Sequence, residues 1–241
     1  MQPYIGNYVS AYGLFASIGL FAMMLISYFR NTKLSFIEFM FLELLMVAGA
    51  ILGSKVMFIF TQVPDIIKHF SMHYMINKIV TSGFVFYGGL FGAILGCILF
   101  SKIRKMKAIE LLNFTAPGYS IFHAFGRIGC FFAGCCYGKE AAWGFALWNE
   151  PYVLRIPIQL IESAYLFGLT VVLLTLERKH KKNIFEVYML SYAIFRFAIE
   201  FWRGDIVRGI WGIFSTSQWL SLFIVLFFIS YEIKKGYSNA K

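Results

Sequence analysis

The stretch FVFYGGLFGAILGCILFSKIRKMKAIELLNFTAPGYSIFHAFGRIGCFFA, residues 84–133, decides the fold. Two continuous apolar runs, 84–101 and 109–133, lie on either side of the basic break SKIRKMK. About 20 consecutive apolar residues allow an α-helix to cross the hydrocarbon core of a bilayer. Neither run alternates between polar and apolar residues as a barrel strand would. The pair therefore predicts two membrane-spanning helices joined by a short loop.

The same pattern continues along the rest of the chain, and the composition agrees with it. Of the 241 residues, 59% are hydrophobic and 14% are charged, whereas a soluble globular chain is nearer half apolar and a quarter charged. No linker rich in Pro, Ser or charge divides the chain. The sequence thus predicts an all-α integral membrane protein, one transmembrane domain over 1–241 with seven transmembrane helices. The predicted spans are 11–29, 36–60, 84–101, 109–133, 157–176, 184–202 and 213–232.

The positions of the basic residues predict the orientation of these helices. When the loops are assigned alternately to two sides, 13 of the 22 Lys and Arg residues share a side with the C-terminus, and six lie on the other side. Basic loops stay in the cytoplasm, so we expect the N-terminus outside and the C-terminus in the cytoplasm. The net charge of +10 does not indicate nucleic-acid binding, because the basic clusters lie between apolar runs, where they face anionic lipid.

Ten polar or ionisable residues in or beside the predicted spans fall in the outer half of the membrane on this topology. Such groups are costly in a bilayer and mark functional sites. Independent structural residues would be scattered over both halves, so the sequence predicts one shared cavity that opens outward. Its candidate residues are Tyr12, Lys55, Tyr87, Arg127, Gln159, Glu162, Arg196, Glu200, Arg203 and Gln218.

Arginines in this set suggest the ligand. Arg196, Glu200 and Arg203 are four and three residues apart, so they share one helix face. An intrahelical ion pair that only holds Arg196 in place is the alternative interpretation. Arg127 lies at a similar depth, and three arginines oriented by a glutamate suit a phosphate, which guanidinium groups bind through two oxygens. A lipid phosphate of the outer leaflet would lie at this level.

Two further sets of residues are open to two interpretations. His123 shares a helix face with Arg127 and Cys130, yet taken alone it is more often a hydrogen-bonded histidine of a helix bundle than a catalyst. Gly88 and Gly89 belong to the glycine-rich YGGLFGAILG. Such glycines usually let helices pack closely, although these two also leave room for a lipid headgroup.

The four cysteines, Cys97, Cys130, Cys135 and Cys136, do not have the CxxC spacing of a zinc site, so no metal and no cofactor is expected. Cys97 lies in the middle of a span and is expected to pack as a small hydrophobic residue. The other three lie at the outer end of a span, where a disulfide is chemically permitted. A reactive thiolate promoted by the nearby arginines is a third alternative.

Six segments spread over nearly the whole chain occur in a recognisable order. They are AYGL (11–14), FYGGLFG (86–92), GRIGCFFAGCCYG (126–138), RIPIQLIE (155–162), YAIFRFAIEFWRGD (192–205) and STSQWLSL (215–222). In order and approximate spacing they resemble the prolipoprotein diacylglyceryl transferase family. The resemblance implies seven spans with an outward N-terminus, and transfer of a diacylglyceryl group from phosphatidylglycerol to the lipobox cysteine of a prolipoprotein, with release of glycerol phosphate.

The resemblance also implies roles for single residues. Arg127 and Arg196 match the essential arginines of the family, and Glu200 and Arg203 match its acidic and basic pair. The residues matching its other polar positions are Tyr12, Tyr192, Gln159 and Glu162.

Five family positions differ in this chain. Tyr87 stands where the family usually has His, and Lys55 where an arginine is usual. Within the segment 126–138, Cys130 and Ala133 replace two asparagines, and Cys135 replaces an acid. The phosphate-binding set is therefore kept, while the expected base and its polar neighbours have changed.

The sequence predicts a phosphatidylglycerol-dependent transferase of the bacterial plasma membrane, with its active site open to the outer leaflet. The predicted catalytic residues are Arg127, Arg196, Tyr87, His123 and Glu200. The predicted substrate-binding residues are Tyr12, Lys55, Gly88, Gly89, Cys130, Cys135, Gln159, Glu162, Tyr192 and Arg203. The expected partners are phosphatidylglycerol, a prolipoprotein signal peptide or other outward-facing acceptor, and membrane lipids. Two alternatives remain, namely the same donor with a different acceptor or transferred fragment, and a non-catalytic protein that binds or transports lipid.

Overall fold

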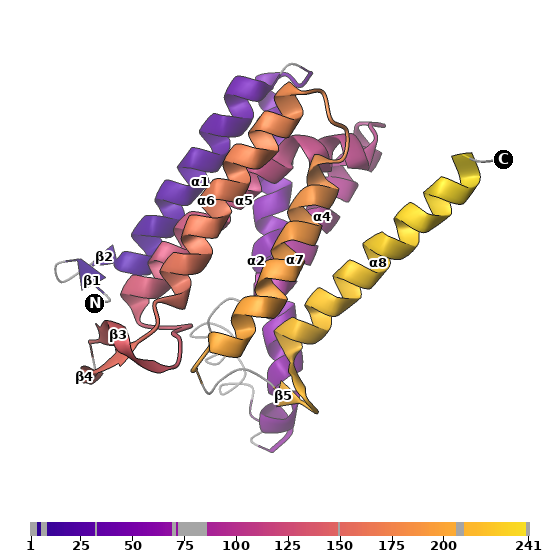
Figure 1. Cartoon of the computed structure of the whole chain (residues 1–241). Helices are drawn as coiled ribbons and strands as arrows, with labels where there is room; N and C mark the ends of the chain where they lie inside the picture. The colour runs from indigo at the N-terminus through magenta and orange to yellow at the C-terminus, as the bar shows by residue number, and fades with distance from the viewer. Residues whose placement is uncertain are drawn as a thin grey trace. The chain divides into compact units, whose positions relative to one another are not determined.

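The computed structural model describes residues 4–5, 9–31, 33–68, 71, 86–148, 150–205 and 210–239 (Figure 1). The described chain is mostly helical, and its helices are α1 (Ala11–Arg30), α2 (Phe36–Lys68), α4 (Phe86–Ile103), α5 (Ala108–Ala133), α6 (Ile158–Arg178), α7 (Ile184–Ile199) and α8 (Thr216–Asn239). The described residues also form three antiparallel hairpins, β1 (Tyr4–Ile5) with β2 (Val9–Ser10), β3 (Glu140–Leu147) with β4 (Glu150–Arg155), and β5 (Ile210–Trp211) with β6 (Phe214–Ser215).

Within these described residues, one helix lies over each predicted span, so the prediction of a helical chain is confirmed. Four boundaries differ by more than two residues, and one of them is the end of α8 at Asn239, beyond the predicted residue 232. α2 continues beyond residue 60 to Lys68. α7 ends at Ile199, and a turn of 3₁₀ helix, η1 (Glu200–Trp202), follows it. α8 begins at Thr216, because the β5–β6 hairpin takes up the residues before it.

Capping boxes explain where two of the helices begin. In α2, the Ser35 hydroxyl accepts a hydrogen bond from the Glu38 backbone N–H at 3.3 Å, and the Glu38 carboxylate accepts one from the Ser35 N–H at 2.9 Å. Ser215 and Gln218 form the same reciprocal pair at the start of α8. Each box satisfies two backbone donors that have no partner in the first turn of a helix.

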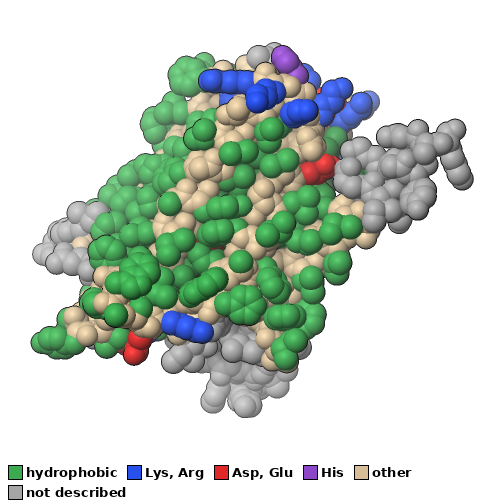
Figure 2. All heavy atoms as spheres, in the orientation of Figure 1, with side chains coloured by type: hydrophobic (Ala, Val, Ile, Leu, Met, Phe, Trp, Pro, Cys, Tyr) green, Lys and Arg blue, Asp and Glu red, His purple; other side chains and the backbone are tan. Residues whose placement is uncertain are grey.

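Among the residues that the structure describes, four helices are long and apolar enough to cross a membrane by length and composition. They are α1, the part of α2 over Phe36–Phe60, α4 and α6. Figure 2 shows hydrophobic side chains along the helices on one face, with Lys and Arg gathered near helix ends. Exposed large apolar residues such as Phe21, Val171 and Phe223 would be costly in water and are expected in lipid.

The chain forms two compact units. The larger unit comprises Met1–Phe29 and Asn113–Lys241, and the smaller unit comprises Arg30–Leu112. That the two act as one transmembrane domain stays a prediction.

In the larger unit, α1 packs on α5 and α5 packs on α6. A Cβ on Gly19 of α1 would lie 2.8 Å from the Phe125 Cβ, so the glycine allows close approach. The Ser163 hydroxyl of α6 donates a hydrogen bond to the Ala124 carbonyl of α5 at 2.9 Å. Polar bonds between helices of this kind stabilise bundles that lack a hydrophobic driving force between helices.

The contacts continue from α6 to α7 and from α7 to α8. Tyr165 of α6 stacks on Phe195 of α7 with ring centroids 3.8 Å apart, and its hydroxyl donates to the Ser191 carbonyl at 2.8 Å. Gln218 of α8 donates to the Phe197 carbonyl at 3.4 Å. This packing brings polar residues from α5, α6, α7 and α8 into one unit.

In the smaller unit, α2 and α4 pack through glycines. A side chain on Gly49, Gly53 or Gly92 would collide with the backbone of the opposite helix, and one on Gly88 would collide with the backbone and Met57 Cβ of α2. Small residues therefore set the close approach of these two helices.

Candidate functional site

Arg127 joins three helices of the larger unit at a buried position. Its guanidinium lies 3.0 Å from the Glu162 carboxylate of α6 and donates a hydrogen bond to the Tyr192 hydroxyl of α7 at 3.4 Å. That hydroxyl in turn donates to Glu162 at 2.7 Å. Since Arg127 is 7% exposed and Glu162 is 1% exposed, this closed triangle fixes the guanidinium in one orientation.

Arg196 is held in a similar way near the end of α7. Its guanidinium lies 2.7 Å from the Glu200 carboxylate one turn later, and it donates to the Ser217 hydroxyl of α8 at 3.3 Å. Both charged residues are 3% exposed. The intrahelical ion pair considered in the sequence is therefore present, and Ser217 links it to the next helix.

Arg203 follows η1 and completes the set. It donates two hydrogen bonds to the Asp205 carboxylate, at 2.8 Å and 2.5 Å, and it lies 4.0 Å from Glu200. The backbone holds it in place, because the Lys139 N–H donates to the Trp202 carbonyl at 2.9 Å and the Gly204 N–H donates to the Tyr137 carbonyl at 3.0 Å. The segment that follows the cysteines thus lies directly beside Arg203.

The arginines keep hydrogen-bond donors that their carboxylate partners do not use. Pairing offsets the cost of burying each charge, and a guanidinium has five N–H donors, so a paired arginine can still bind an anion. Arg196 illustrates this, because its Nη1 is buried and has no hydrogen-bond partner among the described residues. The arrangement can therefore accept a phosphate group, whose oxygens suit guanidinium forks.

Three other predicted residues lie near this network. His123 is buried one turn before Arg127, and its ring meets that of Tyr192 edge-on at 4.7 Å. Tyr12, at the start of α1, packs against Gly129 of α5. Gln159 donates to the carbonyl of Cys135 at 2.6 Å.

The end of α5 brings two of the cysteines together through a Schellman motif. The Gly134 N–H donates to the Phe131 carbonyl at 3.2 Å, and the Cys135 N–H donates to the Cys130 carbonyl at 3.2 Å. Gly134 has φ +70°, the left-handed conformation that glycine adopts readily at this position. The motif therefore folds Cys135 back over the last turn, beside Cys130.

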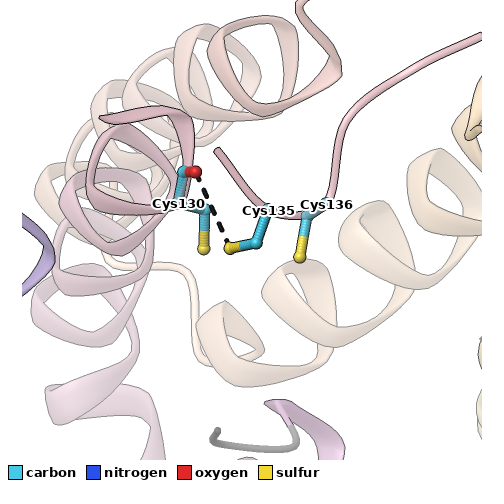
Figure 3. A group of neighbouring side chains, drawn as sticks. All are labelled: Cys130, Cys135 and Cys136. Atoms are coloured by element: carbon cyan, nitrogen blue, oxygen red, sulfur yellow. Dashed lines mark hydrogen bonds between the residues drawn. The ribbon is translucent and has the colours of Figure 1, made fainter. Parts of the chain in front are cut away.

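Cys136 joins them. Its own φ is +59°, uncommon for a residue with a side chain. The Sγ atoms of Cys130, Cys135 and Cys136 all lie within 4.8 Å of one another. Figure 3 shows the three thiols beside the end of α5, where the Cys135 thiol donates a hydrogen bond to the Cys130 carbonyl oxygen at 3.7 Å. All three are free thiols, Cys135 exposed and the other two half-buried.

The environment of Cys136 favours its thiolate form. Hydrogen bonding from the Cys130 thiol, then from the Cys135 thiol, and the positive charges of Arg203 and Arg127 hold its pKa well below the ordinary value for cysteine. The thiols thus interact electrostatically with the arginine network.

Four predicted site residues belong to the smaller unit. Tyr87 is buried at the start of α4 and contacts Phe86 and Phe91. Gly88 packs against α2, as the alternative interpretation of these glycines expects. Lys55, in α2, and Gly89, in α4, are half-buried. Their roles stay predictions.

The sequence interpretation missed three partners in the network. Cys136 was not singled out as a site residue, although it is adjacent to Cys135. Asp205 follows Arg203 by two residues, a spacing that gives no helical signal. Ser217 lies 21 residues after Arg196, so helical spacing gives no signal for their contact.

The comparison with known proteins identifies the family. The family model described as prolipoprotein diacylglyceryl transferase matches residues 4–233. A Clostridium tetani relative, named phosphatidylglycerol–prolipoprotein diacylglyceryl transferase, is 32% identical over 231 residues, covering 92% of this chain and 91% of its own. A relative from Clostridium perfringens, with the same name and the number 2, is 33% identical over 231 residues, covering 92% and 89%.

A relative from a third organism has the same name. The relative of the same name from Cupriavidus necator is 32% identical over 189 residues, covering 75% of this chain and 68% of its own. The match includes the segments that carry Arg127, Arg196 and the cysteines. The chain therefore belongs to the prolipoprotein diacylglyceryl transferase family.

Proposed function

We propose that Arg127, Arg196 and Arg203 hold the phosphate of phosphatidylglycerol while the chain moves its diacylglyceryl group to the lipobox cysteine of a prolipoprotein. As a member of its family, the chain is a transferase enzyme, and the names of its relatives state this donor and this acceptor. The observation that carries the proposal is the burial of the three arginines in one unit, each fixed by a carboxylate.

The chemistry of the transfer explains why cations are needed. The acceptor thiolate attacks the sp³ carbon of the glyceryl group, the C–O bond to phosphate breaks, and the electron pair stays on the phosphate oxygen. A phosphodiester with one negative charge becomes a phosphate monoester with two. Fixed guanidinium groups stabilise this developing charge more than the starting charge, which lowers the barrier.

The remaining predicted residues have one of three proposed roles, which are to orient an arginine, to accept a proton or to contact the substrate. Glu200 orients Arg196, and Glu162 and Tyr192 orient Arg127. Tyr87 or His123 accepts the proton of the acceptor thiol. The residues assigned to substrate contact are Tyr12, Lys55, Gly88, Gly89, Cys130, Cys135 and Gln159.

The proposed setting is the bacterial plasma membrane, crossed seven times, with the N-terminus outside and the site open to the outer leaflet. The support is the excess of Lys and Arg on the C-terminal side of the predicted topology. The helices that lie over the predicted spans add to it. Prolipoprotein signal peptides reach the enzyme from this side.

Purified protein incubated with phosphatidylglycerol and a lipobox peptide tests the proposal. Mass spectrometry of the peptide should show the addition of one diacylglyceryl group on its cysteine and the release of glycerol phosphate. A peptide that gains glycerol phosphate instead would show that a different fragment is transferred. Stable binding of labelled phosphatidylglycerol with no product would show a lipid-binding protein without turnover, and would contradict the proposal.

A further inference from the structure

We propose that Cys130, Cys135 and Cys136 together bind one Zn²⁺ ion, and that the ion's open fourth position binds and activates the acceptor thiol. This inference rests on the proposed function, because the thiol to be activated is the lipobox cysteine. The metal site itself rests on geometry and charge alone.

The sulfur positions suit a single ion. Zn²⁺ binds thiolate sulfur at about 2.3 Å with tetrahedral geometry, which places three sulfurs about 3.8 Å from one another. The three Sγ atoms already lie within 4.8 Å of one another, so small side-chain rotations would bring them to one ion. The side chains point to the same side of the segment that ends α5 (Figure 3).

The backbone around the cluster is built independently of any ion. The Schellman motif joins Cys135 to Cys130, and the Gln159 side chain holds the Cys135 carbonyl at 2.6 Å. The Lys139 N–H, three residues after Cys136, is bonded to the Trp202 carbonyl. This scaffold means that little conformational freedom is lost when an ion binds. The C-terminal end of α5 also carries a partial negative charge, which favours a cation.

A zinc complex of this cluster would carry negative charge. Three thiolates with one Zn²⁺ carry a net charge of minus one, and a bound acceptor thiolate raises it to minus two. Arg127 and Arg203, each paired with a carboxylate, lie close enough to Cys136 to interact with it electrostatically, so positive charge is present beside the negatively charged complex. Soft thiolate ligands select Zn²⁺ or Cu⁺ over hard ions.

The exposure of Cys135 favours a zinc site that keeps its fourth coordination position open over one closed by four protein ligands. Catalytic zinc ions have three protein ligands and leave a fourth position to water or substrate. Cys135 is exposed while Cys130 and Cys136 are half-buried, so a ligand from outside can reach the ion past Cys135. A peptide thiol is a soft ligand of the required kind.

The reaction balances with the ion in the role that the proposed function gives to Tyr87 or His123. The acceptor thiol binds Zn²⁺ through sulfur and releases its proton to water, since a coordinated thiol is deprotonated. The zinc-bound sulfur then forms the S–C bond as the C–O bond breaks, and the electron pair leaves with glycerol phosphate. The thioether product is a weak ligand and dissociates, and the oxidation state of Zn²⁺ does not change. This role matters here, because Tyr87 stands where the family usually has a histidine, and tyrosine is a weak base near neutral pH.

The first test measures the metal content of the full chain. The purified protein in detergent is reduced, incubated with Zn²⁺ and then separated from unbound Zn²⁺. We expect one Zn²⁺ per chain for the natural protein and for the control Cys97→Ser, whose thiol lies in the smaller unit. Cys130→Ser, Cys135→Ser and Cys136→Ser should each lose it. Titration with Co²⁺ should show sulfur-to-metal charge-transfer absorption only in the natural protein and in Cys97→Ser. Equal metal content in the natural protein and a triple serine variant, with all thiols shown to be reduced, would overturn the site.

The second test separates this inference from the proposed function. A chelator should slow diacylglyceryl transfer by about 100-fold, the size of a general-base contribution, and added Zn²⁺ should restore it. Full transfer activity in metal-free protein would overturn thiol activation and leave the proposed function intact. Binding of Zn²⁺ by a chain that transfers nothing would support the metal site and overturn the proposed function.

Discussion

The Arg127 guanidinium lies 3.0 Å from the Glu162 carboxylate, and the two side chains join α5 to α6 in a buried position. This pair connects the segment that carries the cysteines to the segment that follows the β3–β4 hairpin. Because Tyr192 bonds to both side chains, α7 is held in the same arrangement. The orientation of the proposed phosphate site therefore depends on this contact.

Replacing Glu162 with Gln should destabilise the protein. Removing one partner of a buried ion pair leaves an uncompensated charge and costs about 3 to 5 kcal/mol. Thermal unfolding in detergent should show a lower midpoint. The matched control is Glu150→Gln, because Glu150 pairs with Arg155 in a hairpin and is 39% exposed, so its loss should cost less than about 1 kcal/mol. Equal effects of the two changes would contradict the importance of burial.

Tyr192→Phe should lower the rate of transfer while the fold is kept. The change removes the hydroxyl shared by Arg127 and Glu162 but keeps the ring that meets His123. Loss of a hydrogen bond to a charged group corresponds to roughly tenfold in rate. Tyr165→Phe, which removes a hydroxyl that donates to the Ser191 carbonyl, should transfer at close to the natural rate. An unchanged transfer rate in Tyr192→Phe would show that this hydroxyl is not needed to orient Arg127.

Arg203→Lys should raise the KM for phosphatidylglycerol. Lysine keeps the charge but lacks the planar fork that makes two hydrogen bonds to Asp205. The side chain would therefore be less well positioned for a phosphate. Steady-state kinetics with varied lipid would detect the change, and Arg104→Lys, in the smaller unit, is the control. A KM equal to that of the control would show that charge alone is enough at this position.

Gln159→Ala should loosen the segment that carries the cysteines. The change removes the 2.6 Å hydrogen bond to the Cys135 carbonyl, so Cys135 and Cys136 should react faster with a membrane-impermeant maleimide. Ser163→Ala, which removes a bond from the same helix to Ala124, should leave their labelling unchanged. Identical labelling in both variants would show that the Schellman motif alone holds the segment.

Helix positions could be predicted because the apolar runs are long and the breaks between them are short and charged. The start of α8 was placed too early, since the hairpin residues Ile213 and Phe214 are themselves apolar. The β3–β4 hairpin was treated only as a hydrophilic break. Its strands are short and irregular, with register shifts between Glu140 and Leu147, and such strands leave little alternation in the sequence.

The site could be predicted in part. Arg196, Glu200 and Arg203 share a face through helical spacing alone, and the structure pairs the first two directly. Asp205 could not be assigned to Arg203, because the chain leaves the helix at η1 and the spacing rule no longer holds. The cysteine cluster depends on a Schellman motif and a left-handed Cys136, neither of which apolar periodicity reveals.

The central claim is that buried arginines hold the lipid phosphate, and the transfer rates of Arg127→Ala and Arg196→Ala test it most directly. Both variants and the control Arg104→Ala would be purified from membranes and assayed with phosphatidylglycerol and a lipobox peptide. We predict that both variants insert into the membrane and transfer no detectable diacylglyceryl group, whereas the control transfers at the natural rate. Retained transfer by either Arg127→Ala or Arg196→Ala would contradict the phosphate site.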